Sequence, residues 1–356
     1  MKLLHSADWH LDSPIFGRTQ AQSDLLRDAL LQLPHKVVAA AKAERCDLML
    51  LSGDLFDGPY SQESIQALKT ALKEAGIPVF ISPGNHDFVG AASPWLTETW
   101  PENVHIFTSR LVESVSIPEL DCRVYGAAFT AMEDTGLLED FHTQGAEAWH
   151  LGVFHGDPTL AGSPYGPVTA EQVRASGLSY LALGHIHKGG SFQAGNTLCA
   201  WSGCPMGRGF DELDAKGVNI VTLEDSCQLR FLPLDTPRFY DWELEVGADA
   251  AATLLGHLPG AGSADFYRIT LTGESEPIDT DALLAQFSGF PNLQLRDRTV
   301  PPIDLWASIG SDTLEGAYFG LLQQAMEGAD PDTCRKIALA ARISRQLLDG
   351  REVKLP

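Results

Sequence analysis

The chain has 356 residues, a formal net charge of −22 at pH 7, 44% hydrophobic residues and 20% charged residues. This length predicts a large core and two domains, and the composition is that of a soluble globular protein. Because no apolar run approaches the roughly 18 residues of a membrane helix, and the first apolar stretch is too short for a secretory signal, we expect neither insertion nor export. The six cysteines show no paired spacing, which favours free thiols and a cytoplasmic location.

The acidity bears on possible partners. A protein that holds long duplex DNA through many phosphate contacts is usually basic, so the net charge argues against tight autonomous binding of duplex DNA. It does not exclude a nuclease, because the charge around a site can differ from the total. A well-solvated surface that keeps the protein soluble explains the acidity equally well.

The first two thirds of the chain alternate predicted strands and helices, which is typical of an α/β domain. We expect strands at residues 2–6, 47–51, 78–82, 149–154 and 179–183. We expect helices at 22–45, broken or kinked by Pro34, and at 61–75, capped by Ser61 and ended by Gly76. After Lys188 four short β segments suggest a second sheet packed on the first: 191–193, 197–201, 218–223 and 228–232.

A domain boundary is expected near residue 235, giving domains 1–235 and 236–356. Beyond it, apolar residues at 240, 242, 244 and 246 alternate with acidic ones, which predicts a half-buried strand. Similar patterns at 267–271 and 293–295, with helical stretches at 249–258 and 281–287, predict a small α+β domain. Two helices should close it. One begins near Asp312, in a capping box with Glu315, and the other begins at Asp330-Pro331 and ends at Gly350.

Five short motifs occur where predicted strands end: Asp8-Trp9-His10, Gly53-Asp54-Leu55-Phe56-Asp57, Gly84-Asn85-His86-Asp87, His155-Gly156-Asp157 and Gly184-His185-Ile186-His187. In α/β domains, ligands collect outside the carboxyl ends of the strands. We therefore expect these motifs to meet at one site. They offer two carboxylates, one amide and four imidazoles as metal ligands, namely Asp8, His10, Asp54, Asn85, His155, His185 and His187.

This ligand set predicts a two-metal phosphoesterase centre. Mixed nitrogen and oxygen ligands suit Mn, Fe or Zn better than the all-oxygen sites of Ca or Mg. The Asp54 carboxylate could bridge two ions with its two oxygens, and a metal-bridged hydroxide would attack the phosphate.

The imidazole of His86 is left over and is the expected catalytic group, which either gives a proton to the leaving oxygen or stabilises its charge. Asp87 is expected to orient that imidazole. Asp57 either supports a ligand histidine or only caps its turn.

These motifs in this order resemble the calcineurin-like metallophosphoesterase superfamily, and in particular its SbcD/YhaO-like DNA repair exonucleases. The run Leu4-His5-Ser6-Ala7-Asp8-Trp9-His10-Leu11-Asp12-Ser13-Pro14 and the run Ser202-Gly203-Cys204-Pro205-Met206-Gly207-Arg208-Gly209-Phe210 carry the closer resemblance, with Lys216-Gly217 behind the second. The motif match covers about residues 1–235.

The resemblance implies a four-layer α/β/β/α core with a smaller C-terminal α+β capping domain, and two Mn ions. One ion would be held by Asp8, His10, Asp54 and His187, and the other by Asp54, Asn85, His155 and His185. It further implies that the second domain positions DNA, that an ABC-type ATPase partner binds the C-terminal helices, and that a homodimer is possible. The chain departs from this pattern in its acidity. Its one modest basic cluster, which a solvated helix face also explains, is Arg335, Lys336, Arg342, Arg345, Arg351 and Lys354.

The leading hypothesis is therefore a Mn-dependent DNA exonuclease acting in DNA repair. The alternative is a phosphatase or phosphodiesterase for a small molecule or phosphoprotein, because the same centre performs that reaction. A scaffold for an ATPase partner is a third possibility, but a scaffold does not need seven metal ligands.

Overall fold

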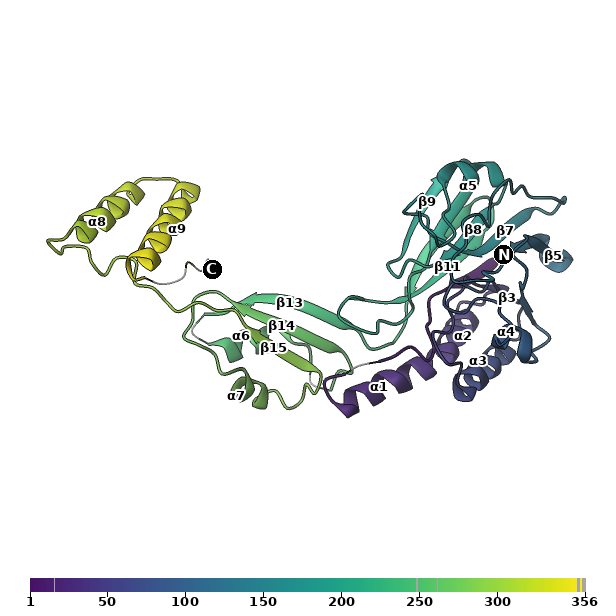
Figure 1. Cartoon of the computed structure of the whole chain (residues 1–356), viewed down its shortest axis with the longest axis horizontal. Coiled ribbons are helices and arrows are strands. Elements are labelled where there is room, and N and C mark those ends of the chain that lie inside the picture. Colours follow the sequence, from purple (N-terminus) through teal and green to yellow (C-terminus); the bar gives the residue numbers. More distant parts are fainter. Residues whose placement is uncertain (16, 248, 261, 351–352, 354–356) are drawn as a thin grey trace. The chain divides into compact units, whose positions relative to one another are not determined.

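The computed structural model describes residues 1–15, 17–247, 249–260, 262–350 and 353 of the chain (Figure 1). The chain divides into two compact units, Met1–Phe239 and Tyr240–Pro356, each with a hydrophobic core of its own. No helix in the described part of the chain is long and apolar enough to cross a membrane.

The first sheet of the N-terminal unit has the strand order β12-β11-β1-β2-β3-β4. Strands β1 to β4 run parallel, whereas β11 pairs antiparallel with β1, and β12 with β11. The bounds are β1 Lys2–Ser6, β2 Leu48–Leu51, β3 Val79–Ile81, β4 Val104–Ile106, β11 Gly217–Leu223 and β12 Cys227–Pro233. The helices after β1, β2 and β3 are α1 Gln20–Leu31, α2 Leu33–Ala43, α3 Gln62–Ala75 and α4 Pro94–Thr97.

The predicted long helix is interrupted as expected near its proline. It divides at Gln32, and Pro34 lies in the first turn of α2, where a missing N–H breaks no helical bond. Helix α3 also begins and ends as expected. The Ser61 hydroxyl accepts from the backbone N–H of Ser64, and Gly76 takes the left-handed conformation with φ 67°.

The second sheet has the order β5-β6-β7-β8-β10-β9. The bounds are β5 Glu113–Ile117, β6 Cys122–Gly126, β7 Trp149–His155, β8 Tyr180–Gly184, β9 Gly190–Ala194 and β10 Thr197–Trp201, with a 3₁₀ turn at Pro118–Leu120 and helix α5 at Ala170–Ser176. The expectation that the four segments after Lys188 make up the second sheet is wrong. Strands β9 and β10 join it beside β8, whereas β11 and β12 extend the first sheet.

The two sheets face each other across a shared core. Buried side chains from both sheets meet there, among them Leu3, Leu50 and Phe80 from the first and Val153 and Ala182 from the second. A separate cluster lies between the second sheet and α5. With α2 and α3 packed on the other side of the first sheet, this gives the expected α/β/β/α layers.

The C-terminal unit contains a sheet with the order β13-β14-β15, in which β14 and β15 are parallel. Its elements are β13 Phe239–Glu245, α6 Ala250–His257, β14 Phe266–Thr272, α7 Thr280–Ala285, β15 Leu293–Asp297, α8 Leu314–Met326 and α9 Pro331–Leu348. Helix α9 begins as expected, with Asp330 as the cap and Pro331 in the first turn. For α8 the expected Asp312 cap is wrong, because the Thr313 hydroxyl accepts from the Gly316 N–H.

Of the basic residues predicted to cluster near the end of the chain, the four that the structure describes are each paired with a carboxylate. Arg342 and Arg345 are buried and pair with Glu274 and Glu315. Arg335 and Lys336 are exposed and both pair with Asp332 on the same helix. The remaining two residues of that cluster, Arg351 and Lys354, lie outside the described residues.

Candidate metal centre

The five motifs meet at the N-terminal unit's strand ends. Asp8, Asp54 and Asn85 follow β1, β2 and β3 of the first sheet, whereas His155 ends β7 and His185 follows β8 of the second. The site therefore lies where the carboxyl ends of strands from both sheets come together, which joins the two halves of the expected ligand set.

The backbone at these strand ends is strained. Asp8, His10, Asp54 and His185 have positive φ angles of 57°, 49°, 51° and 96°, which non-glycine residues adopt at a cost of about 1–3 kcal/mol each. Such strain clusters at functional sites because the surrounding structure holds it there. It turns these side chains inward.

Glycines let the strand ends approach. A Cβ atom on Gly184 would lie 2.0 Å from the Ser52 carbonyl oxygen, and one on Gly84 would lie 2.2 Å from Asp54 Oδ1. Since backbone cannot move away from such contacts cheaply, the glycines of the motifs are required by this close approach.

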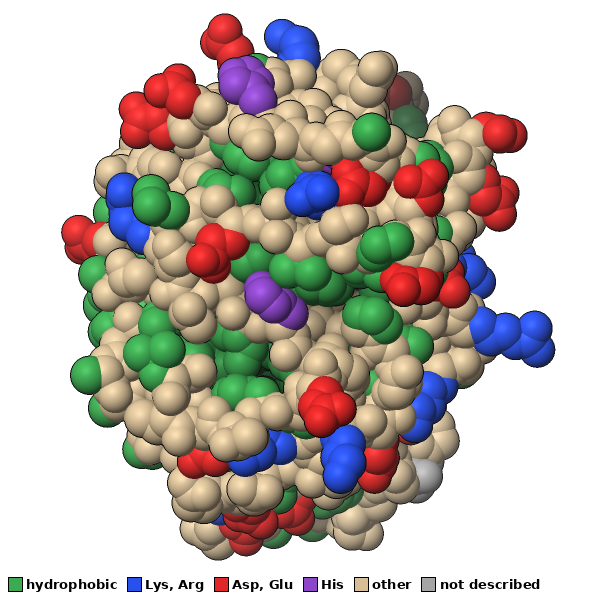
Figure 2. Space-filling view, turned by 90° about the vertical axis from the view of Figure 1, so that its right-hand side faces the viewer, with side chains coloured by type: hydrophobic (Ala, Val, Ile, Leu, Met, Phe, Trp, Pro, Cys, Tyr) green, Lys and Arg blue, Asp and Glu red, His purple; other side chains and the backbone are tan. Residues whose placement is uncertain are grey.

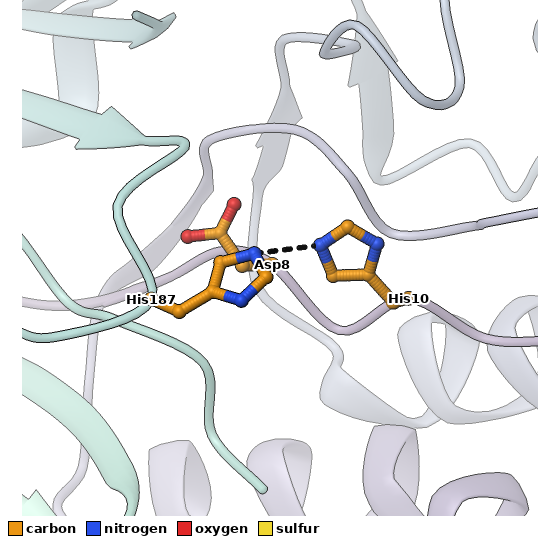
Figure 3. A group of neighbouring side chains, drawn as sticks. All are labelled: Asp8, His10 and His187. Carbon is orange, nitrogen blue, oxygen red and sulfur yellow. Dashed lines mark hydrogen bonds between the residues drawn. The ribbon is translucent and has the colours of Figure 1, made fainter. Parts of the chain in front are cut away.

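Asp8, His10 and His187 form a first group of candidate ligands, with one ligand atom of each within 4.8 Å of the others. Figure 3 shows the Nε2 atoms of His10 and His187 facing each other, 3.0 Å apart, beside the Asp8 carboxylate. Asp8 Oδ1 accepts from the His185 N–H at 2.9 Å, whereas its buried Oδ2 has no hydrogen-bond partner among the described residues. Burial raises the pKa of Asp8 to about 6, so its ionised form needs a compensating cation.

The other ring nitrogens of these histidines face carboxylates. His187 Nδ1 donates to Glu212 Oε1 at 2.6 Å, and His10 Nδ1 lies 3.4 Å from Asp57 Oδ2. A neutral imidazole that carries its proton on Nδ1 has a lone pair on Nε2. The two Nε2 atoms, 3.0 Å apart, share one proton in a hydrogen bond when one ring is protonated there, and present two lone pairs to a metal ion when both rings carry their proton on Nδ1.

Asp54, His155 and His185 form a second group by the same measure. His155 Nδ1 donates to the Ser52 carbonyl at 2.9 Å, which leaves Nε2 as the ligand atom. That Nε2 lies 2.9 Å from the amide oxygen of Asn85 and 3.4 Å from Asp54 Oδ2. All of the sequence-predicted ligands are thus brought into two adjoining groups.

Asp54 is shared between the groups through one oxygen. Its Oδ2 lies 3.8 Å from His10 Nε2 and 3.4 Å from His155 Nε2, whereas Oδ1 accepts from the His86 N–H at 2.9 Å. Oδ2 thus faces both groups, and the bridging of two ions by the Asp54 carboxylate stays a prediction. Burial, followed by the nearby carboxylates of Asp87 and Asp8, raises the pKa of Asp54 well above its usual range.

His86 lies at the rim of the centre with 41% of its side chain exposed. Its Nδ1 is 3.0 Å from Asp57 Oδ1, and its ring centroid is 4.9 Å from that of His10. The hydrogen bond to Asp57 raises the pKa of His86, because a carboxylate stabilises the imidazolium. His86 is thus a protonatable imidazole beside the candidate ligands.

The expectation that Asp87 orients His86 is wrong, and Asp57 makes that contact instead. The Asp87 carboxylate is fully buried and accepts from backbone N–H groups of the motif turns, from Gly84 at 2.7 Å, Leu55 at 2.8 Å, Asp54 at 3.2 Å and Phe56 at 3.3 Å. A carboxylate engaged by four backbone N–H groups holds the turns that carry Asp54 and Asn85. Its oxygens therefore face these turns and not the ring of His86.

Sequence reasoning missed Glu212 altogether and gave Arg208 no role. Glu212 is buried and accepts from His187 Nδ1, and Arg208 Nη2 donates to the same oxygen at 2.8 Å. Burial raises the pKa of Glu212, but the bonds from His187 and Arg208 outweigh it and hold the pKa below its usual range. The only available signal was the position of Glu212 just after the run 202–210, which points to no particular contact.

The sequence pattern of the calcineurin-like phosphoesterase family matches residues 1–189, which hold all of the candidate ligands. The chain belongs to this family. The family resemblance drawn from the five motifs is therefore confirmed.

Curated relatives support the nearer branch as well. The chain is 33% identical over 244 residues to the uncharacterized metallophosphoesterase YhaO of Bacillus subtilis (strain 168). This alignment covers 62% of this chain and 57% of YhaO. The chain is 28% identical to the D component of the nuclease SbcCD of the same organism, over 62% of this chain and 66% of that one. The chain is also 25% identical to the D component of the nuclease SbcCD of Staphylococcus epidermidis. This alignment covers 82% of this chain and 84% of that one. The chain thus spans less than two thirds of the first two relatives.

Among solved structures, a dimetal phosphatase from Danio rerio aligns with a TM-score of 0.44 and 13% identity, over 65% of this chain and 98% of that one.

Proposed function

We propose that this protein is a dinuclear-metal phosphodiesterase, and that it acts as a Mn-dependent DNA exonuclease in DNA repair. The observation that carries the proposal is the pair of adjoining ligand groups that share Asp54, with a protonatable histidine, His86, at their rim.

Asp8, His10, Asp54 and His187 are the proposed ligands of one ion, and Asp54, Asn85, His155 and His185 those of the other. The free Asp8 Oδ2 and the apposed Nε2 atoms of His10 and His187 support the first assignment. The Asn85 and Asp54 oxygens near His155 Nε2 support the second. Nitrogen and oxygen donors together fit Mn, with Fe or Zn as alternatives.

Two bound ions would supply Lewis-acid stabilisation of the phosphate and an activated water for in-line attack. The chain itself supplies the proton. With Nδ1–H held by Asp57, the His86 ring can give its Nε2 proton to the leaving oxygen, and the Asp57 carboxylate stabilises the charged ring before transfer.

DNA as the substrate rests on the two relatives named as nucleases. On the face drawn in Figure 2, acidic and basic side chains of the described residues are interspersed, without a continuous basic patch. Together with the net charge of −22, this favours the alternative, a phosphatase or phosphodiesterase for a small molecule or phosphoprotein.

An ABC-type ATPase is the proposed partner, at α8 and α9. The two helices pack on each other, with the Arg345 guanidinium 4.3 Å from the Phe319 ring centre and Tyr318 Oη 2.8 Å from Ser344 Oγ. They still expose the large apolar side chains Leu314, Leu321, Leu339, Leu347 and Leu348. Leu321→Glu should weaken co-purification with the ATPase without changing phosphodiester cleavage. Equal recovery of the ATPase would count against this location.

A role of the second domain in positioning DNA, a homodimer and a cytoplasmic location are proposals carried over from the resemblance.

The deciding experiment is cleavage of end-labelled single- and double-stranded DNA with Mn, with Mg and without metal. His86→Ala should abolish turnover while the protein still binds its ions. His142→Ala is the matched control, because His142 is an exposed histidine of the same unit that bonds to the Ala175 carbonyl.

Mn-dependent shortening of DNA that only His86→Ala loses would support the whole proposal. Hydrolysis of chromogenic phosphoesters without any cleavage of DNA would move the protein to the alternative. Full activity of His86→Ala would remove His86 from the mechanism.

A further inference from the structure

The loop after β10 contains a carboxylate whose acceptor positions are all engaged. Glu212 Oε1 accepts from His187 Nδ1 at 2.6 Å and from Arg208 Nη2 at 2.8 Å, and Oε2 accepts from the Arg208 backbone N–H at 2.8 Å and from its Nε at 3.4 Å. Glu212 is only 7% exposed. A buried carboxylate with four donors is held in one place.

Arg208 links this carboxylate to a second one. Its Nη1 lies 3.9 Å from Asp57 Oδ2, the oxygen that is 3.4 Å from His10 Nδ1. One guanidinium therefore lies between the two carboxylates that face His10 and His187 from outside the centre. Glu212 thereby holds the His187 ring with its Nε2 turned inward, and Asp57 lies beside the His10 ring.

The second ligand group is supported differently. His155 Nδ1 donates to a neutral backbone carbonyl, that of Ser52, at 2.9 Å. A carboxylate makes the imidazole it holds a stronger ligand than a neutral carbonyl does, because it stabilises positive charge on the ring. The two ion sites are thus unequal in their outer contacts.

We propose that Glu212 and Arg208 are positioning residues for the ion held by Asp8, His10 and His187, with Glu212 fixing the tautomer and orientation of His187 and Arg208 fixing Glu212. This inference rests on the proposed two-metal centre. It assigns to the loop after β10 control over one of the two ions.

A third ion between His187, Cys204 and Glu212, which lie close enough to hold one, does not compete with this role. Glu212 is already engaged by Arg208, and Cys204 Sγ lies 3.5 Å from the His187 carbonyl oxygen. Burial raises the pKa of the Cys204 thiol, which favours its neutral form in the metal-free protein.

The test is a calorimetric titration of Mn²⁺ into the metal-free full-length protein, comparing wild type, Glu212→Gln and Arg208→Met. Wild type should show two binding events. Glu212→Gln should weaken one of them by about 10- to 100-fold and leave the other unchanged. Arg208→Met should weaken the same event less, because the Arg208 backbone N–H still holds Glu212. Glu224→Gln, in the exposed turn between β11 and β12, is the matched control and should titrate as wild type.

A purely structural role would lower the melting temperature of the metal-free protein and weaken both events together, and that result would overturn the proposal, as would unchanged binding in Glu212→Gln. If Glu212→Gln does not fold, ¹⁵N-histidine spectra of the metal-free wild type decide the matter. They should show His187 with its proton on Nδ1, and a proton on Nε2 would overturn the proposal. A wild type that binds no Mn²⁺ would instead refute the proposed metal centre, and this inference with it.

Discussion

His10 and His187, 177 residues apart in the chain, face each other through Nε2 atoms only 3.0 Å apart. His187 Nδ1 donates to the Glu212 carboxylate, and His10 Nδ1 lies 3.4 Å from Asp57 Oδ2, so both rings can present an Nε2 lone pair to the space between them. The free Asp8 Oδ2 lies in the same group of residues. A cation bound beside these groups would engage the buried carboxylate and both rings, and this arrangement determines what substitutions here should do.

Asp54→Asn should weaken the binding of both ions, whereas Asp8→Asn should weaken the binding of one. Asp54 Oδ2 faces both ligand groups, and Asp8 belongs to one of them. We expect affinity losses above the roughly 100-fold typical of residues behind the ligands. Metal content after dialysis, measured by atomic emission, checks this. Asp225→Asn, in the exposed β11–β12 turn, should keep both ions, and equal losses in the Asp54 and Asp8 variants would contradict the shared role of Asp54.

Gly184→Ala should destabilise the protein by about 1–3 kcal/mol or more, because the added methyl group would meet the Ser52 carbonyl oxygen at 2.0 Å. The same oxygen accepts from His155, so metal binding should weaken as well. Gly162→Ala is the control, since a Cβ there would meet nothing within 4 Å. Thermal unfolding of both variants tests the prediction, and equal melting temperatures would show that the strand ends are less tightly joined.

Asp87→Ala should act on stability before it acts on chemistry. It would leave the backbone N–H groups of Gly84 and Leu55, among others, without their acceptor, at a cost of about 3 kcal/mol. Denaturant unfolding of the metal-free protein measures this loss. An Asp87→Ala protein with wild-type stability and reduced turnover would restore Asp87 to the role of orienting His86.

His5 should make the protein less stable in acid. Burial lowers the pKa of its imidazole from 6.5 to about 3. In the folded protein its Nδ1 is 2.7 Å from Tyr180 Oη, and its Nε2 is 3.1 Å from the Leu183 carbonyl oxygen. At a pH between these two pKa values, His5 binds a proton in the unfolded chain but not in the native protein. The contribution of His5 is therefore complete above pH 6.5 and is lost as the pH falls toward 3.

In His5→Gln the free energy of unfolding should depend less steeply on pH between about 6 and 4, by up to about 1.4 kcal/mol per pH unit. Urea unfolding at several pH values measures the slope. A His5→Gln slope equal to that of the wild type would mean that this histidine is not held neutral.

Local sequence signals placed much of the N-terminal unit correctly. The helix between Ser61 and Gly76 was predictable, because a cap and a left-handed glycine act within one turn of the chain. The break before Pro34 was predictable for the same reason, since a proline removes a hydrogen bond from its own helix. The Asp312 cap failed because two neighbouring residues, Asp312 and Thr313, could each have capped the helix.

What the sequence by itself determined is the family and the candidate ligands, because ligand types next to strand-ending glycines are local features of the chain. Only the tertiary structure decided which sheet each strand joins. Strand β11 pairs with β1 through Thr222 and Lys2, far apart in sequence, while His155 and His185 come from the other sheet. The tertiary structure also decided that Asp57 rather than Asp87 contacts His86, and that Glu212 holds His187. Contacts between distant segments depend on packing of the sheets, which no local pattern records.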